Sequence, residues 1–145
     1  KLDLALCLGN SLTLLPDEAA VAQTVQNVAA ALSDGGLFLV QVLNYALPRN
    51  LEPRCRIERR AVDGEEVVAV KALAPSKGRT YLTLTYFAGE EAVSEAAVQQ
   101  NLGKEFLCKV MEMAGLKVIE TLGGYDGRDY DAETSPDVLV VGQKT

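Results

Sequence analysis

The sequence LDLALCLGNS at positions 2–11 decides the fold. An apolar run that continues on both faces is typical of a strand buried in a parallel sheet, and Gly9-Asn10-Ser11 stops it sharply. Pro16-Asp17-Glu18 then opens a predicted helix over 17–33, with acidic residues where the helix dipole favours them. Gly35-Gly36 ends this helix, and Leu37–Leu43 is a second buried strand. Residues 1–45 therefore predict a strand–helix–strand crossover of an α/β fold.

Residues 54–88 have the pattern of antiparallel strands. Two extended runs, Cys55–Val62 and Val67–Leu73, flank Asp63-Gly64, which is a hairpin signal. Thr80–Phe87 then alternates between apolar and polar side chains. We expect three antiparallel strands here, with one face exposed to water.

Residues 93–145 return to helix and strand. An apolar helical face ends at Gly115 and consists of Phe106, Leu107, Val110, Met111 and Ala114. The start of this helix is left open between Val93 and Gly103. Leu116–Leu122 and Val138–Gly142 are predicted strands, joined by a polar loop. The length of 145 residues suits a single domain.

The composition excludes several classes of function. A net charge of −6 opposes non-specific nucleic-acid binding, and no apolar stretch reaches the roughly 18 residues of a membrane span. The absence of histidine removes Ser-His and Cys-His catalysis and histidine-ligated zinc and haem. Cys7, Cys55 and Cys108 are odd in number and far apart, which favours buried thiols in a reducing cytoplasm. We therefore expect a cytoplasmic protein with no nucleic-acid or membrane partner.

One basic cluster interrupts this acidic chain. It contains Arg49, Arg54, Arg56, Arg59 and Arg60, with two glutamates among them. A solvated strand face is the favoured interpretation, and a site for a polyanion is the alternative.

Five segments resemble, in order, class I S-adenosylmethionine-dependent methyltransferases. Asp3–Leu12 is similar to the fourth strand and following loop of that family, and Leu32–Val40 is similar to the L-x-x-G-G entry to the fifth strand. Asn44-Tyr45 matches the pair after that strand. Met113–Val118 resembles the entry to the sixth strand, and Ser135–Lys144 resembles the last. The most similar group is that of the small-molecule glycine and sarcosine N-methyltransferases.

The resemblance implies the C-terminal half of a Rossmann-like sheet, with residues 54–88 as a three-stranded antiparallel insertion. The implied strand order is Leu2–Leu8, Leu37–Leu43, Val138–Gly142, Leu116–Leu122. The third of these is antiparallel to its neighbours, and both long helices lie on one face. The glycine-rich loop and the ribose-binding acid of the family's first half do not occur in these residues. Together with a start in mid-strand at Lys1, this absence leads us to expect a piece of a longer protein, a single partial methyltransferase domain.

The resemblance also implies a site at the carboxyl ends of the first two strands. The backbone of Leu8 and Gly9 would lie beside the sulfonium of S-adenosylmethionine, since a residue without Cβ permits close approach; a plain strand-end turn is the alternative. Asn10 would bind the acceptor substrate, with turn chemistry as the alternative. Asn44 and Tyr45 end the neighbouring strand at the same edge, where α/β sheets bind ligands; core packing is the alternative for Tyr45.

Two further residues are candidates for substrate binding. Arg49 would pair with a substrate carboxylate, and a solvated arginine is the alternative. Tyr125 would close over the site, and a mobile surface loop is the alternative. Methyl transfer needs mainly alignment and exclusion of water, so the lack of histidine does not oppose it.

Two functions from different classes follow. The first is methyl transfer from S-adenosylmethionine to a small-molecule acceptor by the full-length protein, with this chain inactive alone. The second is a non-catalytic α/β module for binding or assembly. In the family's sheet the strand matching Leu2–Leu8 pairs with a strand absent from this chain, so we expect a homo-oligomer through that edge or through the bare sheet face.

Overall fold

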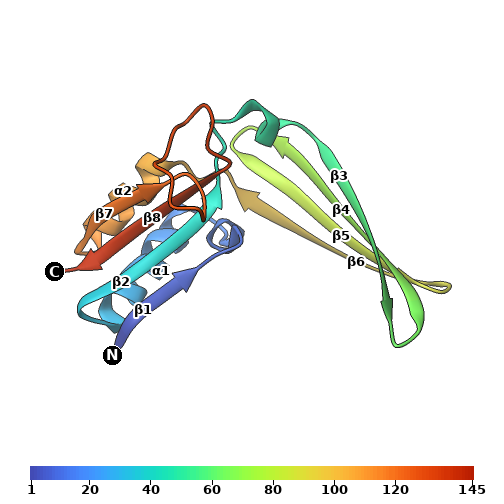
Figure 1. Cartoon of the computed structure of the whole chain (residues 1–145), viewed down its shortest axis with the longest axis horizontal. Coiled ribbons are helices and arrows are strands. Elements are labelled where there is room, and N and C mark those ends of the chain that lie inside the picture. The colour runs from blue at the N-terminus through green and yellow to red at the C-terminus, as the bar shows by residue number, and fades with distance from the viewer.

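The computed structural model describes residues 1–145, which form two four-stranded sheets that meet at an angle (Figure 1). The first sheet has the order β1 (Leu2–Cys7), β2 (Leu32–Leu43), β8 (Asp137–Lys144), β7 (Leu116–Leu122). β1 and β2 are parallel, whereas β8 is antiparallel to both of its neighbours. The expected strand order and the antiparallel last strand are confirmed.

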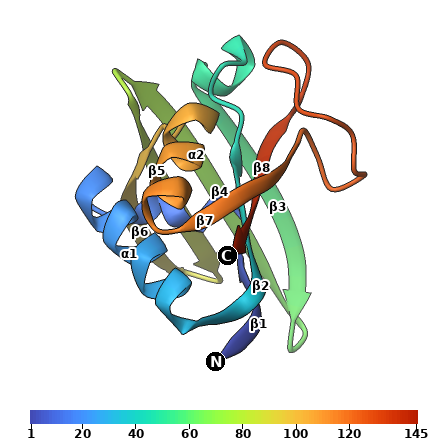
Figure 2. The same ribbon diagram turned by 90° about the vertical axis from the view of Figure 1, so that its left-hand side faces the viewer.

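Two helices cover one face of the first sheet, as expected. α1 (Glu18–Ala31) and α2 (Lys104–Met113) contact each other on the same side of that sheet (Figures 1 and 2). The Asp17 carboxylate accepts a hydrogen bond of 2.8 Å from the Ala20 amide and so caps α1. Neither helix is long and apolar enough to cross a membrane. The core between helices and sheet includes Val21, Val25, Phe38, Val40, Leu107, Met111, Val138 and Val140.

β2 begins at Leu32, earlier than the expected Leu37, and its first part turns through the pair of glycines. Gly35 has a φ of +79°, which glycine adopts without a steric penalty. A Cβ at Gly36 would lie 2.8 Å from the backbone oxygen of Ser33. Both glycines are therefore required by the corner that brings the chain from α1 into the sheet.

β1 is not buried on both faces, and that expectation is wrong. Ala5 and Cys7 pack against the core under the helices. Leu4 and Leu6 lie on the opposite face and are 53% and 56% exposed. β1 is the edge of its sheet, and no helix of the chain covers this second face. We call the surface around Leu4 and Leu6 the bare face.

The second sheet has four antiparallel strands, not the expected three. They are β3 (Arg54–Val62), β4 (Glu65–Ser76), β5 (Arg79–Ala88) and β6 (Glu91–Gln100), in this order. β6 overlaps the range from Val93 to Gly103 in which the second helix is expected to begin. Its alanines and glutamates are good helix formers, but continuous pairing with β5 outweighs that preference.

One face of the second sheet turns toward the first sheet. Thr80 near the start of β5 pairs with Gln99 near the end of β6, and these residues are 2% and 6% exposed. The next pair, Tyr81 and Val98, points to the opposite face and is 52% and 43% exposed. Because side chains alternate along a strand, the face that carries Thr80 also carries Leu84 and Tyr86. We call it the inner face and the opposite one the outer face.

Candidate functional site

A sharp turn follows β1 at its carboxyl end. Gly9 and Asn10 have φ values of 68° and 63°, the left-handed region that glycine and asparagine tolerate best. A Cβ at Gly9 would meet no atom nearer than the Ser11 Oγ at 4.0 Å. Gly9 and Leu8 are both exposed, so the backbone here is open to a ligand.

Asn10 ties this turn to β2 through two hydrogen bonds, and to Tyr45 just beyond β2 through a third. Its backbone N–H donates to the Gln41 Oε1 at 3.1 Å, and its Oδ1 accepts from the Leu43 N–H at 3.0 Å. Its Nδ2 donates to the Tyr45 hydroxyl at 3.0 Å. Asn10 is only 7% exposed. The second proton on Nδ2 has no acceptor within the chain.

Tyr45 also keeps a free donor. Its hydroxyl accepts the hydrogen bond from Asn10, and no group of the chain accepts the hydroxyl proton. Tyr45 is 9% exposed and lies just beyond the end of β2. The expected proximity of Asn10 and Tyr45 is thus present, and together they offer an O–H and an N–H at the edge of the sheet.

Gln41 is part of this arrangement and was not predicted. It is 5% exposed, accepts from the Asn10 N–H, and donates from Nε2 to the Asp137 Oδ1 at 2.7 Å. It therefore links the turn after β1 to the start of β8. A glutamine inside the apolar run Leu37–Leu43 indicates such a role, because a buried side-chain amide needs hydrogen-bond partners.

Asn44, a predicted substrate-binding residue, uses all of its hydrogen-bonding capacity within the chain. Its Nδ2 donates to the Ala132 and Ser135 carbonyls at 3.0 and 2.9 Å. Its Oδ1 accepts from the Ala46 N–H at 3.1 Å and the Tyr130 hydroxyl at 3.2 Å. It is 1% exposed. These contacts fix the loop between β7 and β8 and leave no group of Asn44 for a substrate.

Tyr130 supports Asn44 as a neutral donor. Burial raises the pKa of its hydroxyl, and the carboxylates of Glu105 and Asp131 raise that pKa further. The Lys104 Nζ lies 5.3 Å from the centre of the Tyr130 ring, within cation–π range. The tyrosine therefore stays protonated and joins α2 to the loop.

No hydrogen bond joins Arg49 or Tyr125 to Asn10 or Tyr45. Arg49 lies on the short 3-10 helix η2 (Pro48–Leu51), is exposed and forms no ion pair. Tyr125 is 65% exposed in the loop after β7. Their roles in substrate binding stay predictions.

The cysteines differ in exposure. Cys55 is exposed on β3, so the expectation of buried thiols is wrong at this position. Cys7 and Cys108 are half-buried, and burial raises the pKa of both thiols. The chain contains no cluster of three or more metal-ligating side chains.

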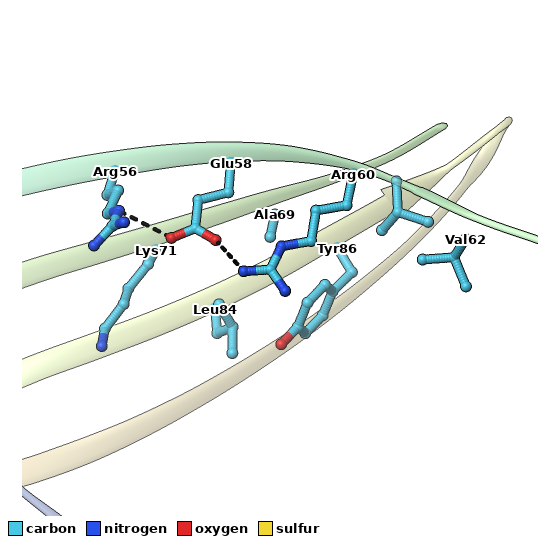
Figure 3. A pocket seen from close by; sticks show the side chains of 9 residues that line it. Arg56, Glu58, Arg60, Val62, Ala69, Lys71, Leu84 and Tyr86 are labelled. Carbon is cyan, nitrogen blue, oxygen red and sulfur yellow. Dashed lines mark hydrogen bonds and ion pairs between the residues drawn. The ribbon is translucent and has the colours of Figure 1, made fainter. Parts of the chain in front are cut away.

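A cavity of about 380 Å³ lies on the inner face of the second sheet (Figure 3). The Glu58 carboxylate lies between two guanidinium groups, with the Arg56 Nε at 2.9 Å and the Arg60 Nη2 at 3.3 Å. Lys71 forms no ion pair. The nine lining residues all belong to the inner face by the strand register and are Arg56, Glu58, Arg60, Val62, Val67, Ala69, Lys71, Leu84 and Tyr86.

Several solved structures share this fold. A sugar N-methyltransferase from a Streptoalloteichus species superposes with a TM-score of 0.80 at 20% identity, over 98% of this chain and 56% of that one. A methyltransferase dependent on S-adenosylmethionine from Clostridium acetobutylicum gives 0.78 at 16% identity, over 98% and 58%. CalS10, an amino pentose methyltransferase from Micromonospora echinaspora solved with S-adenosylmethionine, gives 0.74 at 18% identity, over 99% and 58%.

These similarities establish the fold. The chain has a methyltransferase-like α/β fold and spans somewhat over half the length of these solved structures. No protein-family model matches the sequence, and no curated protein matches it either.

Proposed function

We propose that the full-length protein transfers a methyl group from S-adenosylmethionine to a small-molecule acceptor, and that this chain supplies the acceptor side of the site. One observation carries the proposal. In a methyltransferase-like sheet, the open turn Gly9-Asn10 follows β1 and is hydrogen-bonded to Tyr45 at the end of β2. Ligands of open α/β sheets bind at such carboxyl ends.

The turn after β1 leaves room for the cofactor beside Gly9. The space beside Gly9 is free of protein atoms to 4.0 Å, so the backbone of Leu8 and Gly9 can approach a bound sulfonium closely. S-adenosylmethionine supplies an electrophilic methyl group with a good leaving group. The residues that would hold its adenosine and ribose have no counterpart among the motifs of this chain.

Asn10 and Tyr45 would bind and orient the acceptor. Their two free donors lie next to each other and suit an oxygen atom of the acceptor near the methylated atom. Orientation is the main contribution that such a site makes, because alignment of two bound reactants alone removes much of the barrier. Asn44 holds the neighbouring loop, while Arg49 and Tyr125 are proposed to contact more distant parts of the acceptor.

We infer that the acceptor is a small molecule with an amine. The sequence motifs resemble the glycine and sarcosine N-methyltransferases, and the solved structures with a similar fold include a sugar N-methyltransferase and a glycopeptide N-methyltransferase. An amine can lose its proton before it binds, so no histidine is needed.

A non-catalytic binding or assembly module is the second candidate. The absence of a glycine-rich cofactor loop from the 145 residues favours it for the chain taken alone. Both candidates are compatible with a cytoplasmic protein that assembles through the bare face or the free edge of β1.

Calorimetric titration with S-adenosylmethionine separates the two candidates. We expect the full-length protein to bind the cofactor and to methylate members of a panel of small amines, and the isolated chain to bind it weakly or not at all. Micromolar affinity of the isolated chain would contradict the division of the site. Absence of both binding and transfer in the full-length protein would favour the module.

A further inference from the structure

We propose that the cavity on the inner face of the second sheet binds an organic anion, a carboxylate or phosphate group carried on an apolar body. The cavity is a concave surface on β3, β4 and β5 (Figure 3), and none of its lining residues belongs to the turn after β1. Its volume of about 380 Å³ suits a small molecule or part of a larger one.

The charge of the cavity is opposite to that of the chain. The chain has a net charge of −6, whereas the cavity brings Arg56, Arg60 and Lys71 around the single carboxylate of Glu58. These three cations come from two neighbouring strands, because Arg56 pairs with Lys71 across β3 and β4. The lining therefore carries more positive than negative charge, and the next carboxylate on this face is that of Glu95, opposite Leu84 on β6.

Most of the donors in this cluster remain available. Glu58 engages one nitrogen of Arg56 and one of Arg60. A guanidinium carries five N–H donors and an ammonium carries three, so both arginines and Lys71 can still donate to an anion. Glu58 holds the two guanidinium groups in place, and it also competes with any anion that binds there.

An apolar floor lies beside the cations. Ala69 lies between Glu58 and Tyr86 in the strand register, Leu84 lies beside Lys71, and Tyr86 is 43% exposed. Ala69 pairs with Tyr86 across β4 and β5, so the small side chain leaves the tyrosine ring uncovered. An apolar or aromatic body could lie on this floor while its anionic group reaches Lys71 and the arginines.

The position of the cavity suggests what carries the anion. Thr80 marks the end of the inner face that packs near the first sheet, and Leu84 lies four residues further along β5. At about 3.3 Å per residue, the near edge of the cavity is roughly 13 Å from that junction. The anion would thus be a remote group of an extended acceptor; this assignment rests on the proposed function, whereas anion binding itself does not.

Nuclear magnetic resonance titration of the chain with phenyl phosphate tests the proposal without cofactor or acceptor. We expect shifts of the backbone amides of Lys71, Leu84 and Tyr86 at millimolar concentrations of phenyl phosphate. Benzoate is titrated in parallel. The site prefers a carboxylate if benzoate has the lower dissociation constant, and a phosphate if phenyl phosphate has it. Benzyl alcohol, which has the ring but no charge, should cause much smaller shifts, and equal shifts with it would overturn the proposal.

Four substitutions on the second sheet make the test specific. Lys71→Gln and Arg60→Gln should each weaken binding about tenfold, the effect of one lost charge-assisted hydrogen bond. Glu58→Gln should strengthen binding, because it removes the competing carboxylate. Arg59→Gln makes the same change of charge on the outer face of β3 and should leave binding unchanged.

The outcomes are decisive in both directions. Weakening by Arg59→Gln equal to that by Arg60→Gln would mean a non-specific charge effect and would overturn the proposal, as would weaker binding by Glu58→Gln. If phenyl phosphate binds as expected but the full-length protein transfers no methyl group, the anion site stands and the proposed function fails.

Discussion

The side-chain amide of Asn10 donates a 3.0 Å hydrogen bond to the hydroxyl of Tyr45, 35 positions further along the chain. The same amide accepts from the backbone of Leu43, so the turn after β1 and the end of β2 are fixed to each other. The geometry of the candidate site therefore depends on one asparagine in a left-handed conformation.

Substitution of Asn10 should lower the stability of the chain. Asn10→Ala removes the partners of the Leu43 N–H and the Tyr45 hydroxyl and places alanine at a φ of 63°. We expect the free energy of unfolding to fall by roughly 2–4 kcal/mol, from two hydrogen bonds and the left-handed penalty. Asn27→Ala, an exposed position on α1, should change it by less than about 0.5 kcal/mol. Equal losses in denaturant titrations of the two variants would contradict this account.

Gly36 should not tolerate a side chain. The added Cβ of Gly36→Ala would lie 2.8 Å from the Ser33 carbonyl oxygen, and this backbone atom cannot move without disturbing the corner before β2. We expect a loss of about 1–3 kcal/mol, as for other overpacked sites. Gly103→Ala is the control without a clash, because its nearest neighbour is at 3.7 Å and its φ is −92°; as the N-cap of α2 it should lose only about 0.5 kcal/mol. A loss as large at Gly103 would show that the contact at Gly36 is not the cause.

The three thiols should react at different rates with iodoacetamide near neutral pH. Cys55 is exposed, while burial raises the pKa of Cys7 and Cys108 and so lowers their thiolate fraction. Mass spectrometry of the digested protein should find Cys55 labelled first, and Cys55→Ser should abolish the rapid phase. Rapid labelling of Cys7 or Cys108 in the folded chain would contradict the structure.

The chain should associate with itself. Its accessible surface is 8669 Å², whereas a compact monomer of this length exposes roughly 7,200 Å². The bare face exposes leucine side chains of β1. Because β1 is also the edge strand of its sheet, its free backbone groups can pair with another chain. Light scattering should detect dimers or larger species, and Leu6→Lys should shift them toward monomer. Met113→Lys, at a 67% exposed position on α2, should not. A monomer at high protein concentration would refute self-association.

The sequence predicts the first sheet more accurately than the second. The apolar runs and the glycines at 9, 35 and 36 identify the strands of the first sheet, and the family resemblance gives their order. β6 escaped prediction because its residues favour a helix locally, and only pairing with β5 makes them a strand. The exposure of β1 also escaped prediction, since an apolar strand does not reveal which of its faces other elements cover.

The candidate site is only partly predictable from the sequence, because local sequence does not show which distant segments come into contact. Motif positions identify Asn10 and Tyr45. The hydrogen-bond partners of the Asn44 side chain lie in a distant loop, however, and Ala132 is 88 positions from Asn44 in the sequence. The cavity around Lys71 needs the register of three strands, because its cations alternate with residues of the opposite face. Periodicity alone does not align neighbouring strands.

The most direct test of the central claim compares turnover with cofactor affinity in the full-length protein. Methyl transfer from S-adenosylmethionine to an amine acceptor would be measured for the wild type, Asn10→Ala and the milder Tyr45→Phe, alongside the calorimetric Kd for the cofactor. If the ends of β1 and β2 form the acceptor side of the site, both variants lower kcat about tenfold or more while the Kd stays nearly unchanged. An equal loss in turnover and cofactor affinity, or unchanged turnover in both variants, would contradict the account.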